Sequence, residues 1–103
     1  MHYVYVLYSD SADGFYVGET ADLQLRLSMH NDHLFKGAVT AKASDWSVQI
    51  SFRTENRQQA IIVEKYIKSM KSRKFLQRLC SDPIYARNFC DIVLHKFKIV
   101  LVL

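Results

Sequence analysis

A turn sequence between two short apolar segments constrains the fold most strongly. Residues 3–8 consist of tyrosine, valine and leucine, which are favoured in strands, and residues 15–18 have a similar character. The residues between them are turn formers that end in Asp13-Gly14. The sequence therefore predicts a β-hairpin near the N-terminus, with a loop longer than the tightest two-residue type.

Alternating residues predict a third strand over residues 46–52. Trp46, Val48, Ile50 and Phe52 are apolar, and the residues between them are polar. We therefore expect these four side chains to face one side of a half-buried strand.

Two helices are predicted after this strand. Asn56 precedes Gln59 in a capping-box-like arrangement, and the apolar residues that follow fall on one helical stripe. The stripe consists of Ile62, Val63, Tyr66, Ile67 and Met70. Ser72 is expected to cap a shorter helix, which should end near Asp82-Pro83 because the residue before a proline avoids the helical region.

The residues alone do not decide the structure of two other segments. From Asp22 to His30, apolar and polar residues alternate as in a strand, whereas the composition and the cap-type residues Thr20 and Asp22 favour a helix. The segment from Ile92 to Leu103 is rich in valine, isoleucine and leucine. We expect it to be extended and docked on the core or on another subunit.

The composition indicates one globular domain over residues 1–103. Half of the 103 residues are hydrophobic, and the three glycines and one proline do not form a linker. Neither a secretory signal nor an apolar run of membrane-spanning length is evident. We therefore expect a cytoplasmic protein without membrane association, in which Cys80 and Cys90 are free thiols.

Basic residues are concentrated in the second half of the chain. Residues 1–52 carry three basic and six acidic side chains, whereas residues 53–103 carry eleven basic and four acidic ones. No acidic residue interrupts a basic run between positions 65 and 78. Such a run is a footprint that a polyphosphate can exploit, but charge alone favours the alternative, a solvated helix face.

Several motifs in a fixed order resemble the GIY-YIG nuclease domain. Tyr5 in Val-Tyr-Val and Tyr16 in Tyr-Val-Gly lie eleven residues apart. They are followed by Thr-Ala-Asp-Leu at 20–23, by Arg26-Leu27 and His30-Asn31, and later by Glu64 before Ile67-Lys68. The likeness spans about residues 2–79, is closest to stand-alone bacterial members, and leaves residues 80–103 as a C-terminal extension. It implies an α+β fold, in which helices flank a small three-stranded, mainly antiparallel sheet and Asp22–Asn31 is helical.

The resemblance also implies a catalytic site. Arg26 and His30 are four residues apart, so on a helix they share a face. There the Arg26 guanidinium would hold the scissile phosphate and stabilise its developing charge, and the His30 imidazole would assist. Glu64 would anchor a hydrated Mg²⁺ or Mn²⁺. Tyr5 would activate or position the attacking water, and Tyr16 would hydrogen-bond into the same network.

Each of these residues has a purely structural alternative. The tyrosines could be half-buried strand residues, Arg26 a surface charge, His30 a cation at a helix C-terminus, and Glu64 a partner of Lys68. The chain also departs from the family signature at Tyr3, Val17 and Glu19, and a carboxylate at the last position could repel the substrate or recruit a metal.

The predicted function is a metal-dependent endonuclease that hydrolyses DNA, with branched or damaged DNA, repair and recombination as the expected context. The predicted phosphate track consists of Lys68, Lys71, Arg73 and Lys74. A catalytically weak nucleic-acid-binding module acting with a partner is the alternative. In a third interpretation, an interaction protein forms homo-oligomers through the apolar C-terminal tail.

Overall fold

The predicted hairpin forms the greater part of a three-stranded antiparallel sheet, in a computed structural model that describes residues 1–33 and 39–103. The strands are β1 (His2–Ser9), β2 (Gly14–Thr20) and β3 (Ser47–Thr54), in the order β2-β1-β3. Both predictions, the hairpin and the third strand, are confirmed. β1 is the central strand, and β2 and β3 are its antiparallel neighbours.

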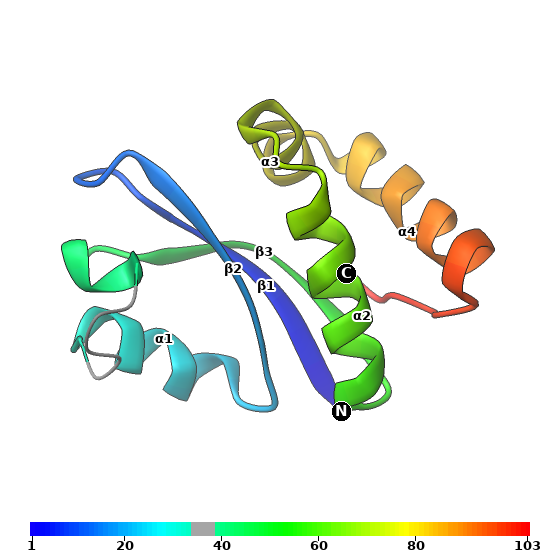
Figure 1. Cartoon of the computed structure of the whole chain (residues 1–103), viewed down its shortest axis with the longest axis horizontal. Coiled ribbons are helices and arrows are strands. Elements are labelled where there is room, and N and C mark those ends of the chain that lie inside the picture. The colour runs from blue at the N-terminus through cyan, green and yellow to red at the C-terminus, as the bar shows by residue number, and fades with distance from the viewer. Residues whose placement is uncertain (34–38) are drawn as a thin grey trace.

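Alternating residues of β1 divide the core between the two faces of the sheet. Val4 and Val6 belong to a large apolar cluster with α2 (Arg57–Ser69), α3 (Arg73–Ser81) and α4 (Pro83–Phe97). Tyr5 and Leu7 face the other side, where they pack with residues of α1 (Leu23–Asn31). A short 3-10 helix, η1 (Val39–Lys42), also lies on the α1 side (Figure 1). The predicted α+β fold is thereby confirmed.

One expectation about β3 is wrong, because its apolar residues do not all face one side. Trp46 and Val48 pack in the cluster on the α1 side, whereas Ile50 and Phe52 pack in the cluster on the α2 side. The register between β1 and β3 shifts here and leaves Gln49 without a paired residue on β1. One additional residue in a strand inverts the alternation beyond it, so β3 contributes to both halves of the core.

The predicted helix starts are confirmed at three caps. Asp22 Oδ1 accepts a hydrogen bond from the Leu25 backbone amide and begins α1, which resolves the ambiguous segment as a helix. Asn56 caps α2 through the Gln59 amide at 2.9 Å, and Ser72 caps α3. The predicted stripe of α2 is correct at Val63 and Ile67, which are buried. It is wrong at Ile62, whose exposed fraction is 41%.

The expectation of an extended segment from residue 92 is also wrong, because α4 continues to Phe97. Asp82 caps α4 by accepting from the amides of Ile84 and Tyr85, and Pro83 occupies its first turn. Lys98 ends α4 with a left-handed backbone, and in the short tail that follows Val102 pairs with Arg53 of β3. Docking on the core is therefore correct for this shorter tail, and self-association through it stays a prediction.

The structure bears on two further expectations. No helix in the described ranges is long and apolar enough to cross a membrane. Cys80 and Cys90 are both free thiols in the structure, and burial raises the pKa of the Cys80 thiol to about 11.

Candidate active site

Tyr5 is a buried phenol whose hydroxyl reaches the α1 side of the sheet. Its side chain is 1% exposed, and the antiparallel register places Gly18 opposite it on β2. Because glycine has no side chain, Gly18 leaves the space that the phenol occupies. The two signature segments are therefore packed against each other at these two residues.

A hydrogen-bonded chain of three side chains begins at this phenol. Tyr5 Oη lies 3.0 Å from His30 Nε2, and His30 Nδ1 lies 2.8 Å from Thr40 Oγ1. His30 is in the last turn of α1 and Thr40 is in η1, and both are almost fully buried. The imidazole is thus held at both nitrogens, which fixes its orientation toward Tyr5.

Tyr16 completes an aromatic group around the hydroxyl of Tyr5. Its ring centroid lies 4.8 Å from that of His30 and 6.4 Å from that of Tyr5. Lys68 Nζ of α2 lies 5.8 Å from the Tyr16 centroid, a cation–π distance. Tyr16 therefore connects the Tyr5–His30 pair with the lysine of the second helix.

Burial and the charges of other side chains shift the pKa of Tyr5 and of His30. Burial raises the pKa of Tyr5 well above that of an ordinary phenol, and Tyr16 raises it further. Arg26 acts in the opposite direction, whereas the carboxylates of Glu64 and Glu19 add to the increase. Arg26, Glu64 and Glu19 are therefore the charged side chains that act on the phenol.

His30 is kept neutral by its surroundings. Burial lowers the pKa of His30 below its usual value, and the positive charge of Arg26 lowers it further. A neutral imidazole has one nitrogen that accepts a proton. Together with Tyr5, this makes a pair in which the phenol holds a proton and the adjacent ring is able to accept one.

Glu64 lies at the α2 side of the same site. Its side chain is only 19% exposed and accepts a hydrogen bond of 2.7 Å from Lys68 Nζ. The ion pair considered as a structural alternative from the sequence is therefore present. In this ion pair, the Glu64 carboxylate still raises the pKa of Tyr5.

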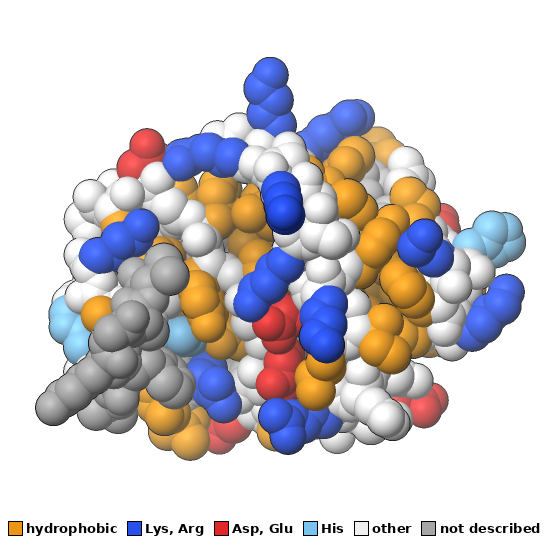
Figure 2. All heavy atoms as spheres, in the orientation of Figure 1, with side chains coloured by type: hydrophobic (Ala, Val, Ile, Leu, Met, Phe, Trp, Pro, Cys, Tyr) orange, Lys and Arg blue, Asp and Glu red, His pale blue; other side chains and the backbone are white. Residues whose placement is uncertain are grey.

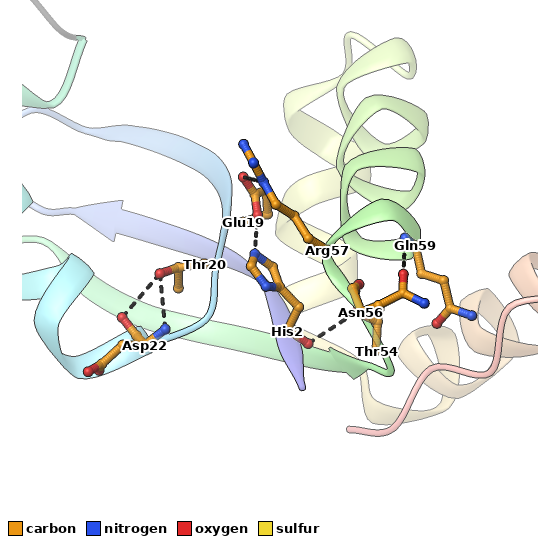
Figure 3. A network of polar contacts seen from close by, with 8 residues as sticks. All are labelled: His2, Glu19, Thr20, Asp22, Thr54, Asn56, Arg57 and Gln59. Atoms are coloured by element: carbon orange, nitrogen blue, oxygen red, sulfur yellow. Dashed lines mark hydrogen bonds and ion pairs between the residues drawn. The ribbon is translucent and has the colours of Figure 1, made fainter.

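Glu19, the acidic departure from the signature, is paired with side chains of this chain. His2 Nε2 contacts one carboxylate oxygen, and Arg57 Nε lies 3.7 Å from the other (Figure 3). The two partners come from the first residue of β1 and the first residue of α2. Glu19 is thus held beside the start of α2, and its charge is offset there by Arg57.

The predicted phosphate track does not form one uniform surface. Lys68 binds Glu64, whereas Arg73 binds Asp13 at the tip of the hairpin through Nη2 at 2.5 Å. Lys71 is exposed at the junction of α2 and α3, and Lys74 is exposed on α3. Figure 2 shows acidic side chains near the middle of this face with lysine and arginine side chains on both sides of them.

The structure therefore brings three of the five predicted catalytic residues into contact, and the charges of the other two influence this group. Tyr5, Tyr16 and His30 are in ring or hydrogen-bond contact, the charge of Arg26 lowers the pKa of Tyr5 and of His30, and the charge of Glu64 raises the pKa of Tyr5. Sequence reasoning missed Thr40, because it belongs to no motif and reaches His30 only through folding. It also missed the pairing of His2 with Glu19, which joins strands whose register the sequence does not specify.

Comparison with known proteins gives a family match over most of the chain. The family model described as the GIY-YIG catalytic domain matches residues 1–77, which include every residue of the site. No curated protein and no solved structure matches the chain.

Proposed function

Given that this chain belongs to the GIY-YIG family of nuclease domains, we propose that it is a divalent-metal-dependent endonuclease that hydrolyses DNA. The family membership itself supports a nuclease-type function. The metal, the roles of the individual residues and the form of the DNA are our proposals. We propose branched or damaged DNA as the substrate class, with repair or recombination as the context.

The observation that carries this proposal is the chain from Tyr5 through His30 to Thr40. With the neutral imidazole protonated at Nδ1, Tyr5 donates to Nε2 and Nδ1 donates to Thr40. The raised pKa of Tyr5 keeps the phenol protonated, so Tyr5 alone is a poor base at neutral pH. The lowered pKa of His30 leaves a nitrogen ready to accept the proton that Tyr5 gives up.

The proposed step moves three protons, forms one bond to phosphorus and breaks another. As the oxygen of a water molecule attacks the phosphorus, one water proton passes to Tyr5 Oη and the phenol proton passes to His30 Nε2. The bond between phosphorus and the leaving oxygen breaks, and that oxygen takes a proton from solvent. Arg26, whose positive charge acts on Tyr5, is the residue that we propose stabilises the negative charge developing on the phosphate.

Glu64 is the residue that we propose holds the metal. The described part of the chain contains no group of three or more His, Cys, Asp or Glu residues able to enclose an ion. Mg²⁺ fits a single largely buried carboxylate, because it keeps several waters and shares its coordination with substrate phosphates. When bound, such an ion neutralises charge on the reacting phosphate.

One observation favours the catalytically weak binding module as a second candidate. The ammonium of Lys68 already occupies the carboxylate of Glu64 at 2.7 Å. A divalent ion can bind Glu64 only if it displaces the Lys68 ammonium or shares the carboxylate with it. If Lys68 keeps the ion from Glu64, the protein would bind DNA without cleaving it. The same lysine would then serve only to contact phosphates.

Glu64→Gln distinguishes these functions, because it removes the charge and preserves the shape. We would measure cleavage of single-stranded, duplex, flap and junction DNA with Mg²⁺, with Mn²⁺ and with neither, together with DNA affinity and thermal midpoint. We expect metal-dependent cleavage by the wild type and its collapse in the variant, with folding and binding preserved.

Glu55→Gln is the matched control, since Glu55 is exposed just before α2 and should leave cleavage unchanged. A Glu64→Gln enzyme with the wild-type rate in Mg²⁺ would refute the metal role. Binding without cleavage of any of these DNAs by the wild type would establish the binding module instead.

A further inference from the structure

We propose that a groove beside Tyr16 binds one unpaired nucleobase of the DNA next to the scissile phosphate. The inference rests on the proposed nuclease function and specifies its substrate, because a base that is still paired and stacked cannot enter such a groove. It makes unpaired nucleotides the feature by which the enzyme recognises its cleavage site.

The groove lies between the free edge of the sheet and the helices that cover it. β2 supplies Phe15, Tyr16 and Val17, and the other side is formed by α2 and α3 with Ile67 and Leu76 among the lining residues. Its volume is about 340 Å³, which is near the lower end of the ~300–1,000 Å³ that small-molecule pockets span. A site of this size accommodates one flat ring system and excludes a double helix.

The lining has the chemistry that a nucleobase requires. Phe15, Val17, Ile67 and Leu76 line the groove from the apolar cluster on the α2 side, and Tyr16, which packs in the cluster on the α1 side, meets it at the strand edge. Bases stack on aromatic side chains such as Phe15 with little regard to sequence. β2 is an edge strand, so part of its backbone N–H and C=O groups point away from β1. These groups are available to the polar edge of a base.

Two lysines give the groove a cationic rim for the phosphates on either side of that base. Lys68 lines it beside the Tyr16 ring, and Lys71 lines it from the end of α2. Lys71 has a left-handed backbone with a φ of 46°, and its amide donates to the Lys68 carbonyl at 3.2 Å. This helix-terminal geometry fixes the point from which the Lys71 side chain starts.

Tyr16 joins the groove to the reacting centre. The same residue that lines the groove has its ring 4.8 Å from His30 and 6.4 Å from Tyr5. A base in the groove therefore belongs to a nucleotide adjacent to the phosphate that Tyr5 and His30 would act on. A peptide strand added to the edge of β2 is the other occupant that the edge allows, but the cationic rim favours a polyanion.

An abasic scan of a flap DNA tests the proposal with the whole protein and Mg²⁺. Single abasic nucleotides are placed in turn at each unpaired position around the junction, and the cleavage rate is measured. We expect an abasic nucleotide at one position to lower the cleavage rate about tenfold, which corresponds to the loss of one base–aromatic stack. Equal rates for all abasic substrates would overturn the proposal.

Filling the groove should cancel that sensitivity. In Leu76→Trp the indole occupies the groove, so the abasic substitution that slows the wild type should make no further difference. Leu94→Trp adds the same side chain at an exposed position of α4 outside the groove and should leave the abasic penalty as in the wild type. If Leu76→Trp folds and retains the full abasic penalty, the base lies elsewhere.

Two lysines with the same backbone conformation provide a second test that does not depend on cleavage. Lys71 follows the C-cap of α2 and Lys98 is the C-cap of α4, with left-handed φ values of 46° and 59°, so Lys71→Gly and Lys98→Gly remove the same charge at backbones that glycine adopts readily. With 2-aminopurine at the sensitive position and Glu64→Gln protein, we expect the bound base to be quenched by stacking. Lys71→Gly should weaken this binding several-fold, and Lys98→Gly should not.

The two readouts separate the failure of this inference from the failure of the nuclease function. Quenching that depends on Leu76 and Lys71, in a protein that cleaves no DNA, would uphold the groove and refute the nuclease. Cleavage with neither quenching nor an abasic penalty would refute the groove alone.

Discussion

The hydroxyl of Tyr5 occupies the place that a side chain on Gly18 would fill. A Cβ atom added to Gly18 would lie 2.4 Å from Tyr5 Oη and 2.6 Å from Tyr5 Cζ, closer than real Cβ contacts come. The glycine of the second signature segment is therefore required for space. It allows the phenol of the first segment to reach His30 across the neighbouring strand.

Gly18→Ala should damage stability and activity together. The added methyl group has to displace a buried ring, which costs about 1–3 kcal/mol of the free energy of unfolding and moves the Tyr5 hydroxyl away from His30. Urea unfolding and DNA cleavage measure the two effects. Gly14→Ala is the control, since its Cβ would meet Lys42 Nζ only at 3.6 Å. Equal behaviour of the two variants would contradict the packing argument.

Thr40→Val should impair the Tyr5–His30 pair from a distance. The substitution keeps the shape of Thr40 and removes the hydroxyl that bonds His30 Nδ1, at a cost of about 1 kcal/mol in unfolding free energy. We expect cleavage to fall by more than this loss of stability explains, because the imidazole loses its orientation. Thr54→Val removes another buried hydroxyl, which bonds His2 and Asn56 backbone oxygens, and should lower stability but spare the cleavage rate.

The pH profile of cleavage should have an acidic limb below the ordinary titration of histidine. Because the pKa of His30 is lowered, the ring stays neutral from neutral pH down to below about 6.5. Cleavage should therefore persist over that range and fall only when His30 is protonated. The raised pKa of Tyr5 predicts no alkaline limb from the phenol below about pH 10. An acidic limb centred above pH 6.5 in kcat/KM would exclude His30 as the acceptor.

Acid should release a contact that ties the hairpin loop to the segment before β3. Asp45 accepts hydrogen bonds from Ser9 Oγ and from the amide and hydroxyl of Ser11, and these lower the pKa of Asp45 to about 2. A lowered carboxyl pKa adds stability that is complete above the unfolded value of 3.8 and is lost as the pH falls through about 2.

Asp45→Asn should therefore reduce the thermal midpoint at pH 7. The difference between the midpoints of the variant and the wild type should be smaller at pH 2. Asp10→Asn removes a charge from the hairpin loop that Asp45 contacts, and it serves as the control. A midpoint difference that is the same at pH 7 and pH 2 would show that the Asp45 charge is not responsible.

Local sequence signals were sufficient for most of the secondary structure. The Asp-Gly turn and the cap residues Asn56 and Ser72 act within a few residues, so the hairpin and the starts of α2 and α3 are readable directly. The sequence misleads where the propensity of a segment and a distant helix cap indicate different structures. The β-propensity of residues 92–97 concealed a helix whose cap, Asp82, lies ten residues earlier.

The sequence by itself determined the family, the α+β class and the identity of the five candidate catalytic residues, because each motif keeps its own order and spacing. Only the tertiary structure decided how they meet. The register between β1 and β2 places Gly18 under Tyr5, and the docking of η1 brings Thr40 to His30. These contacts join residues that are far apart in the chain. Their geometry depends on packing, which no local pattern of residues specifies.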